Sequence, residues 1–588
     1  MQDATESEIG RRATGGTAPT SSAREKLTTG PRDLPLLSCG CRNHRQLRRW
    51  LDAHLQQSPI DNRAPRSAGT LRSLLAEMTR WNAPVRKRLA SLEVLRPIVA
   101  AHCRALSSSS TASGNPGAHT QEQRRDLLTA AILYQHQALA YTSVCLQLSA
   151  APRPLFFRRR MARALHRAID SYRSLVQISS HFYLATPKNG WSRMQYLVRL
   201  AREHQLDQRR VPDSLARTRV GGSRFTSREK VVQPYIQSAL FASANPLQLD
   251  TGDQHLLWTL CTGWAGKAVL QDQYNPAGKS LLASLRLDQA PIPAVRLQQT
   301  RVDPRHFCAP LGWSIDLTRP LQQVQRSLRR PGKRPAELLQ RVLALWAGEQ
   351  GRGGQRTPVN IRCEVILGIS AISRHLKQGG DAVSSLGSAG DAYAGEILVM
   401  EVDAIDFRSG RALKEYEVSA PDAYSSPLPS APSTTRRGDG IGAQKRYQPI
   451  PATLLNTSSG GAGLRLPTDI QGRLHSGDLI AVRVEERWEV ALVRWQYGLP
   501  DQCRAGVEFF GGHTSAVRVH RYTKEGRRTD PMAGLLTGDT GLPPELVLPT
   551  PLFQNGDTVD IVTAGQTRTV TLGQCSMRTG SVAIFEFS

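Results

Sequence analysis

The sequence has no run of about 18 apolar residues, and residues 1–32 are polar, without the apolar segment that a signal peptide contains. We therefore expect neither a membrane span nor a secretory leader, and we expect a disordered tail over residues 1–35. The nine cysteines are odd in number and scattered, which excludes a regular disulfide framework and suits a reducing compartment. These features together predict a cytoplasmic protein.

The signatures of common catalytic sites are also missing. There is no Walker loop, no HExxH and no GxSxG, and the 14 histidines are dispersed without an evident cysteine or serine partner. Paired carboxylates in a suitable setting are absent as well. Cys39 and Cys41, close to His44, resemble half of a metal site, but no second cluster completes it. We therefore expect no enzymatic activity, no metal and no cofactor.

Positive charge is what the sequence has in excess. It holds 76 Lys and Arg against 49 Asp and Glu, a formal net charge of +27. Such a surplus favours anionic ligands and raises nucleic acid as a partner. The arginines are spread along the chain rather than gathered in one block, which favours a solvated surface over a nucleic-acid interface.

The first half of the chain has a helical pattern. At 588 residues, the chain is long enough for about three or four domains. Within residues 36–275, apolar side chains recur at the i, i+3, i+4 and i+7 spacing of one helix face, as in Leu71, Leu74, Leu75 and Met78. Helices joined by short polar loops predict a bundle or a short helical solenoid. A mixed connecting region follows.

The connecting region spans residues 276–349 and contains an expected helix at 335–346, with Pro335 at its first turn. From residue 350 to 525, closely spaced strand patterns predict a small antiparallel β-barrel, interrupted by a Ser-, Pro- and Gly-rich flexible loop at 421–444. Residues 526–588 predict a small β meander, either a separate unit or strands that complete the barrel. The fold class is therefore multidomain α + β: a helical domain, a barrel and a β tail.

Two short motifs carry the chemistry. The first is [D/N]xSxxG, formed by Asn456, Ser458 and Gly461, with further glycines at Gly460 and Gly463. The amide and the hydroxyl can bond a base edge or a phosphate oxygen. The glycines let the backbone approach a ligand closely and expose N–H groups that bind anions.

The second motif is RxxxR, formed by Arg352 and Arg356 upstream of the first barrel strand. A guanidinium donates two parallel hydrogen bonds to a phosphate or to guanine O6 and N7, and it also stacks on purine faces. Two of them on a loop can enclose a compact anionic ligand. The two motifs together predict a nucleotide site.

These motifs resemble those of the PilZ domain family, over residues 350–525 only. The segment 355–365 resembles the opening of a PilZ domain, 456–461 its second motif, and 493–495 with 505–509 its closing strands. The resemblance implies a receptor for cyclic di-GMP. It also implies the ligand residues, namely Arg352, Arg356, Asn456, Ser458 and Gly461, with Gly460 and Gly463 as additional candidates.

The spacing of the two motifs departs from the family pattern. About a hundred residues separate Arg356 from Asn456, where most family members have a few tens. The insertion either leaves the barrel intact or leaves the site degenerate. In the second case Arg436, Arg437 and Arg446 are alternative arginines, nearer to Asn456 in sequence.

We therefore interpret the chain as a cytoplasmic bacterial signalling protein. By the resemblance, it binds cyclic di-GMP and passes the signal to the helical domain, which binds a protein partner and controls motility or biofilm formation. Two alternatives remain open. One is a degenerate PilZ-like scaffold for protein–protein interaction that binds no nucleotide, and the other is a basic nucleic-acid-binding protein.

Overall fold

The computed structural model describes residues 27, 29 and 31–588, with gaps. The gaps are 56–59, 112–120, 151–155, 182–185, 214, 216–227, 250, 300–301, 309–311, 330–335, 349–356, 379–447, 459, 471–473, 485–486, 499–501, 512, 523–527, 539–542, 551, 564–565 and 580. The expected loop at 421–444, and nearly all of the expected tail at 1–35, therefore lie outside the described residues.

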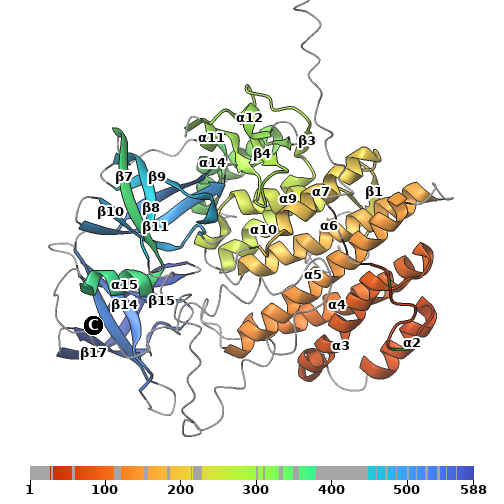
Figure 1. The fold of residues 1–588 in the computed structure, drawn as a ribbon, viewed down its shortest axis with the longest axis horizontal. Helices are drawn as coiled ribbons and strands as arrows, with labels where there is room; N and C mark the ends of the chain where they lie inside the picture. The colour runs from red at the N-terminus through yellow and green to blue at the C-terminus, as the bar shows by residue number, and fades with distance from the viewer. Residues whose placement is uncertain are drawn as a thin grey trace, which may run out of the picture.

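The N-terminal half is a helical domain, as its sequence pattern predicts (Figure 1). Its helices are α2 (His44–Leu55), α3 (Ile60–Arg80), α4 (Val85–Thr111), α5 (Gln121–Ala150), α6 (Phe157–His181), α7 (Gly190–Glu203), α9 (Gln233–Ser243) and α10 (Thr251–Ala265). The predicted apolar face of α3 is buried, because Leu71, Leu74, Leu75 and Met78 are all at most 2% exposed. Helix α5 lies between α3, α4 and α6 and is buried along most of its length.

A short hairpin interrupts the helices. It is formed by β1 (Arg210–Pro212) and β2 (Arg228–Lys230). A 3₁₀ turn, η1 (Pro246–Gln248), joins α9 to α10.

The connecting region is a four-stranded sheet with small helices around it. The strand order is β3 (Val269–Gln271), β6 (Gly312–Asp316), β4 (Ser280–Ser284) and β5 (Ile292–Pro293). The helices are α11 (Ala294–Gln299), α12 (Pro304–Cys308), α13 (Thr318–Leu328) and α14 (Ala336–Ala347). Helix α14 is the one expected at 335–346. Its Trp346 is buried and donates from Nε1 to Ser243 Oγ at 2.9 Å, which fastens this region to α9.

The predicted barrel is a closed ring of six antiparallel strands. In spatial order they are β10 (Leu479–Val484), β11 (Arg487–Gly498), β12 (Cys503–Phe509), β9 (Gly461–Leu466), β8 (Ile450–Ser458) and β7 (Thr357–Leu367). Strands β7 and β8 are neighbours although residues 379–447 separate them in the sequence. The barrel therefore closes across the long insertion.

The C-terminal residues form a second closed barrel of their own. Its order is β13 (His513–Arg521), β14 (Met532–Gly538), β15 (Glu545–Pro549), β18 (Val582–Phe587), β17 (Gln566–Arg578) and β16 (Thr558–Thr563). Of the two alternatives for the tail, the separate β unit is therefore the one found. Strand β13, which lies within the range expected for the first barrel, pairs with β14 and β16 and belongs to the second.

One helix, α15 (Ile369–Gln378), lies between the two barrels (Figure 1). Ile369 and Ile372 pack together with Leu479 and Leu492 from the outer face of the first barrel. Ile584 belongs to the same apolar cluster from the second barrel. A continuous apolar seam therefore joins the two barrels. Within the described part of the chain, no helix has both the length and the apolar character needed to cross a membrane.

Candidate functional site

The first motif forms the hairpin between β8 and β9. Asn456 lies opposite Gly463, and Ser458 lies opposite Gly461. The Ser458 hydroxyl donates to the Gly461 carbonyl at 3.2 Å, so this side chain closes the turn. Gly461 has no room for a side chain, because a Cβ there would lie 2.4 Å from the Val507 carbonyl oxygen of β12. Ser458 and Gly461 therefore have a structural role in the hairpin.

Two irregularities in the barrel turn key side chains outward. The register shifts between Leu454 and Asn456 on β8, and again between Val493 and Trp495 on β11. Leu454 and Val493 point into the barrel core. Without a bulge, residues two positions further along would point the same way, but the extra residue reverses the side chain. Asn456 and Trp495 therefore reach the outer surface of the barrel.

The two outward residues stand at the ends of one row across four strands. In register, Asn456 of β8 is opposite Gly463 of β9, which is opposite Gly506 of β12, which is opposite Trp495 of β11. Residues directly opposite one another share a face of the sheet. We call this set, Asn456, Gly463, Gly506 and Trp495, the glycine row.

The two glycines make the row possible. A Cβ on Gly463 would lie 2.9 Å from both Oδ1 and Nδ2 of Asn456, and a Cβ on Gly506 would lie 2.2 Å from Nε1 of Trp495. The amide and the indole therefore lie close against the sheet, over bare backbone. Gly506 was not among the residues predicted from the sequence. The signal that could have found it is its alternation with the core residues Ala505 and Val507, once β12 is recognised as a strand.

The second motif lies just beyond the described residues. Arg352 and Arg356 fall in the gap 349–356, and Arg436, Arg437 and Arg446 fall in the gap 379–447. Thr357, which follows Arg356 directly in the sequence, lies opposite Thr457. The chain that carries RxxxR is therefore joined by one peptide bond to a residue beside Asn456 and Ser458.

The Trp495 end of the glycine row contacts the rest of the molecule. The Arg296 guanidinium of α11 lies 5.7 Å from the centre of the Trp495 ring, a cation–π distance. The same indole packs on the apolar cluster of the connecting region that contains Leu282, Leu297 and Phe307. A row that begins at the nucleotide motif thus ends in an interdomain contact.

The backbone beside Trp495 is held from the helical domain. Gln248 donates from Nε2 to the Arg494 carbonyl at 2.8 Å, and Asn245 donates to the same oxygen at 3.4 Å. Gln248 in turn accepts a hydrogen bond from Arg341 of α14. The Arg494 guanidinium pairs with Glu508 on the next strand.

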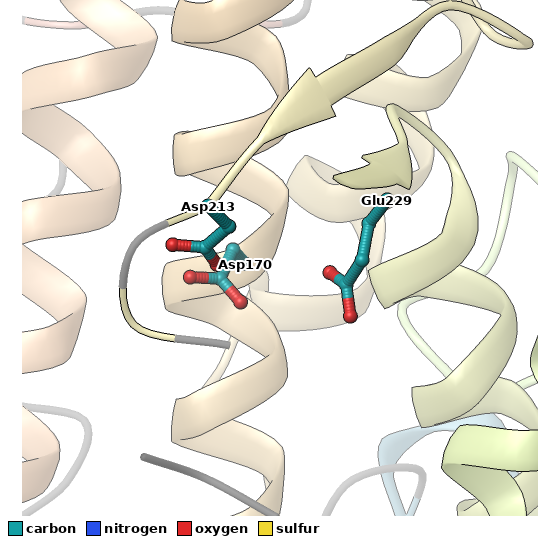
Figure 2. Close-up of side chains that lie close together, drawn as sticks. All are labelled: Asp170, Asp213 and Glu229. Carbon is teal, nitrogen blue, oxygen red and sulfur yellow. The ribbon is translucent and has the colours of Figure 1, made fainter. Parts of the chain in front are cut away.

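A separate group of carboxylates lies in the helical domain (Figure 2). Oxygens of Asp170, Asp213 and Glu229 all lie within 4.8 Å of one another, a spacing that would suit a metal ion. Arginines already occupy this space. Arg96 binds Asp170 and Asp213 at 2.8 Å each, and Arg173 lies 3.1 Å from Glu229.

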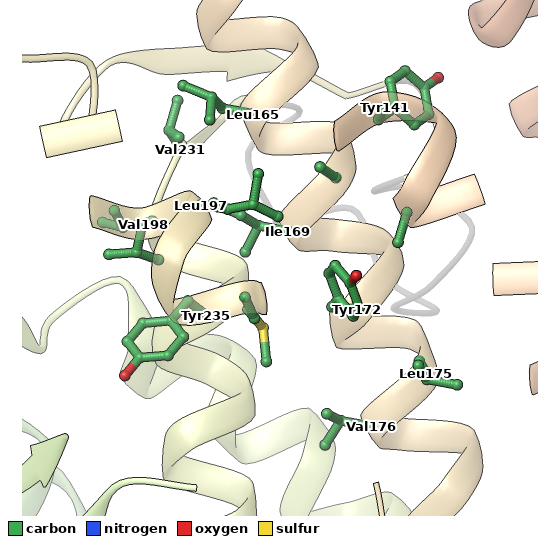
Figure 3. Close-up of a cluster of buried hydrophobic side chains, with 14 of the residues drawn as sticks. Tyr141, Leu165, Ile169, Tyr172, Leu175, Val176, Leu197, Val198, Val231 and Tyr235 are labelled. Atoms are coloured by element: carbon green, nitrogen blue, oxygen red, sulfur yellow. The ribbon is translucent and has the colours of Figure 1, made fainter. Parts of the chain in front are cut away.

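The pKa of Glu229 reflects the nearby positive charges. Burial alone would raise the pKa of Glu229, but Arg173 and His166 outweigh it and hold the pKa at about 2. Glu229 is therefore ionised, and all three carboxylates are paired with arginines. Helix α6, which carries Asp170, also contributes Leu165, Ile169 and Tyr172 to the buried core of the helical domain (Figure 3). The group acts as a structural clamp that fixes the β1–β2 hairpin to α4 and α6.

The closed barrel with its glycine-rich hairpin agrees with the comparisons to known families. Models of three consecutive domains match this chain: "Cyclic-di-GMP receptor FimW, N-terminal domain" at residues 45–276, "Cyclic-di-GMP receptor FimW, middle PilZ domain" at 296–515, and "FimW C-terminal beta-barrel domain" at 517–588. Through its middle domain, the chain belongs to the PilZ family.

A curated relative shares this organisation. The chain is similar to the cyclic-di-GMP receptor FimW of Pseudomonas aeruginosa (strain PAO1), with 24% identity over 576 residues. The match covers 92% of this chain and 90% of the relative. The similarity therefore extends over all three domains, including the helical half that the PilZ resemblance alone does not reach.

Proposed function

We propose that this chain is a receptor for cyclic di-GMP, which it binds on the outer face of β8, β9 and β12. The observation that carries the proposal is the glycine row, in which two glycines let an amide and an indole lie close against the sheet. Thr357, the residue that follows the RxxxR motif in the sequence, lies opposite Thr457 beside this row. The proposal also rests on the name of the FimW relative, a receptor for this ligand.

Each part of the site has a task in this proposal. The guanidiniums of Arg352 and Arg356 bind phosphate oxygens and stack on guanine, and the Asn456 amide bonds a base or ribose edge. Gly463 and Gly506 let the Asn456 amide and the Trp495 indole lie close against the sheet. Ser458 keeps the hairpin in shape and has its oxygen lone pairs available as acceptors.

The signal then passes through the Trp495 end of the glycine row. A ligand can shift the arrangement of the domains only by binding one arrangement more tightly than another. A displacement of Asn456 or of the sheet backbone would be transmitted through β9 and β12 to Trp495. Trp495 in turn contacts Arg296 of the connecting region. We propose that the helical domain, in the cytoplasm, binds a protein partner in response, with motility or biofilm formation as the output.

Calorimetric titration of the full chain with cyclic di-GMP tests the proposal. We expect micromolar or tighter affinity, and a loss of about tenfold or more in Arg356→Ala and in Asn456→Ala, because each removes a hydrogen bond to the charged ligand. Arg518→Ala is the matched control, since Arg518 is exposed on β13 of the second barrel.

The outcomes separate the competing interpretations. A wild-type chain that binds no cyclic di-GMP contradicts the receptor and favours the degenerate scaffold. Binding that is unchanged in both variants contradicts the site. A third outcome is a chain that does not bind cyclic di-GMP but retards DNA or RNA in a gel at low salt, with an affinity that falls steeply as the salt concentration rises. That outcome would replace the proposal with a nucleic-acid-binding function.

A further inference from the structure

An aromatic side chain projects into solvent at the start of α6. Phe156 has 62% of its surface exposed, the largest fraction among the exposed large hydrophobic residues that the structure describes. Its φ is 63°, a left-handed conformation that bulky residues rarely adopt. Its carbonyl accepts a hydrogen bond from the backbone N–H of Arg160 at 3.1 Å, within the first turn of the helix. The backbone that carries the exposed ring is therefore anchored to a helix.

Arginines surround this ring. The Arg160 guanidinium lies 6.0 Å from the centre of the Phe156 ring, at the outer limit of a cation–π contact. Arg158 and Arg159 are exposed on the same turn, and Arg163, three residues beyond Arg160, is half-buried. Residues 156–163 contain no Asp or Glu. The exposed ring is therefore surrounded by positive charge alone on its own helix.

The segment 205–212, which leads into β1, brings two more exposed arginines to this place. They are Arg209 and Arg210. Arg158 donates to the Gln205 carbonyl at 3.1 Å, and Arg167 donates to the Pro212 carbonyl at 2.7 Å. The segment therefore runs antiparallel to α6, and its two arginines lie beside the part of the helix between these contacts. We call the following set the basic corner: Phe156, Arg158, Arg159, Arg160, Arg163, Arg209 and Arg210.

Little negative charge offsets the basic corner. The one carboxylate in residues 205–212 is Asp207, which accepts a hydrogen bond from Gln208 Nε2 at 2.9 Å. The neighbouring carboxylate of Glu203 pairs with Arg199, which is outside the corner. Six arginines and a single carboxylate on two adjacent segments produce a strongly positive surface, which attracts an anionic partner.

The exposed ring favours a lipid surface as that partner over a nucleic acid. Peripheral proteins bind anionic bilayers with apolar side chains that enter the interface and with cations that bind the headgroup phosphates. A single-stranded nucleic acid instead needs several aromatic rings along a groove, and the described residues of the corner offer one exposed ring. Strand β1 lies in the part of the helical domain away from both barrels (Figure 1), so a flat bilayer can approach it without meeting them.

We propose that the basic corner docks the protein reversibly on an anionic membrane surface. The Phe156 ring enters the region between headgroups and acyl chains, and the guanidiniums bind the phosphates with two parallel hydrogen bonds each. An arginine near such a surface raises the partition coefficient about fivefold, which a few of them multiply into stable docking. This function does not depend on the dinucleotide site, so either one can fail without the other.

Vesicle flotation of the full chain tests the proposal, with vesicles of phosphatidylcholine and phosphatidylglycerol against vesicles of phosphatidylcholine alone. We expect binding to the anionic vesicles that weakens as the salt concentration rises. Removing two exposed guanidiniums with Arg159→Ala and Arg210→Ala should lower the partition coefficient about 25-fold and reduce its salt dependence. Phe156→Ser should lower it about three- to tenfold with the salt dependence unchanged, because the ring contributes by burying apolar surface.

The matched control is the double variant Arg319→Ala and Arg326→Ala, which removes the same charge from exposed positions on α13. It should bind the anionic vesicles as the wild type does, and the unfolding temperature of each variant checks that the fold is kept. A control that loses as much as the corner variant, or a wild type that does not float with anionic vesicles, overturns the inference. Unchanged flotation of Phe156→Ser, together with retardation of DNA or RNA that the corner variant loses, would assign the corner to nucleic acid instead.

Discussion

Gly506→Ala is the sharpest single perturbation of the glycine row, because it adds one methyl group where the structure has no space. The new Cβ would lie 2.2 Å from Cε2 and Nε1 of Trp495 and 2.5 Å from Cζ2. These are rigid ring atoms rather than the end of a flexible chain. The indole must therefore leave the sheet, or the strands must separate.

The size of the effect follows from the contacts that Trp495 would lose. Overpacking of this kind costs about 1–3 kcal/mol. The cation–π contact with Arg296, at 5.7 Å, adds about 0.5–1 kcal/mol if it is broken. We therefore expect Gly506→Ala to lower the free energy of unfolding by about 2–3 kcal/mol. The affinity for cyclic di-GMP should fall as well.

A double-mutant cycle isolates the collision with the indole. Trp495→Leu shortens the side chain over Gly506, so Gly506→Ala in that background should cost far less than in the wild type. Denaturant unfolding of the four chains measures the difference. If Gly506→Ala costs the same with and without Trp495, or if it costs nothing, the close approach of the indole to the sheet is not what Gly506 provides.

Two further predictions concern the helical domain. Asp213→Ala leaves the buried Arg96 with one partner fewer and should lower the free energy of unfolding, measured with denaturant, by about 3–5 kcal/mol. Asp33→Ala is the control, because Asp33 is exposed, and it should change this free energy by at most about 1 kcal/mol. Burial lowers the pKa of His136 to about 4, below its ordinary value of 6.5. The contribution of the neutral imidazole to the free energy of unfolding should therefore be complete above pH 6.5, and about 3 kcal/mol of it should be lost as the pH drops to 4. His136→Gln should reduce this dependence of stability on pH. Equal pH dependence in the wild type and the variant would contradict the prediction.

The sequence predicted the elements well where local pattern decides them. The apolar stripe from Leu71 to Met78 predicted a buried helix face because helical periodicity is a local property. The Asn456–Gly461 motif was placed correctly in a strand–turn–strand setting, because glycines between two alternating segments have few other uses. Neither inference needed knowledge of distant contacts.

The parts that the sequence could not predict depend on pairing between distant residues. The position of Thr357 opposite Thr457 depends on hydrogen bonds across the insertion, which no local pattern encodes. Simple alternation from Val493 would send Trp495 into the core, but a bulge turns it outward. The alignment of Gly463 with Gly506 likewise became visible only with the register of the strands.

The apolar seam around α15 has a consequence for how the receptor can be dissected. A fragment that stopped after β12 would leave Ile372, Leu479 and Leu492 without the C-terminal barrel that covers them, and such bare apolar surface promotes aggregation. Deletion of the last domain would therefore yield an insoluble fragment rather than a minimal sensor. In the intact chain, any rotation of the PilZ barrel must move the C-terminal barrel with it.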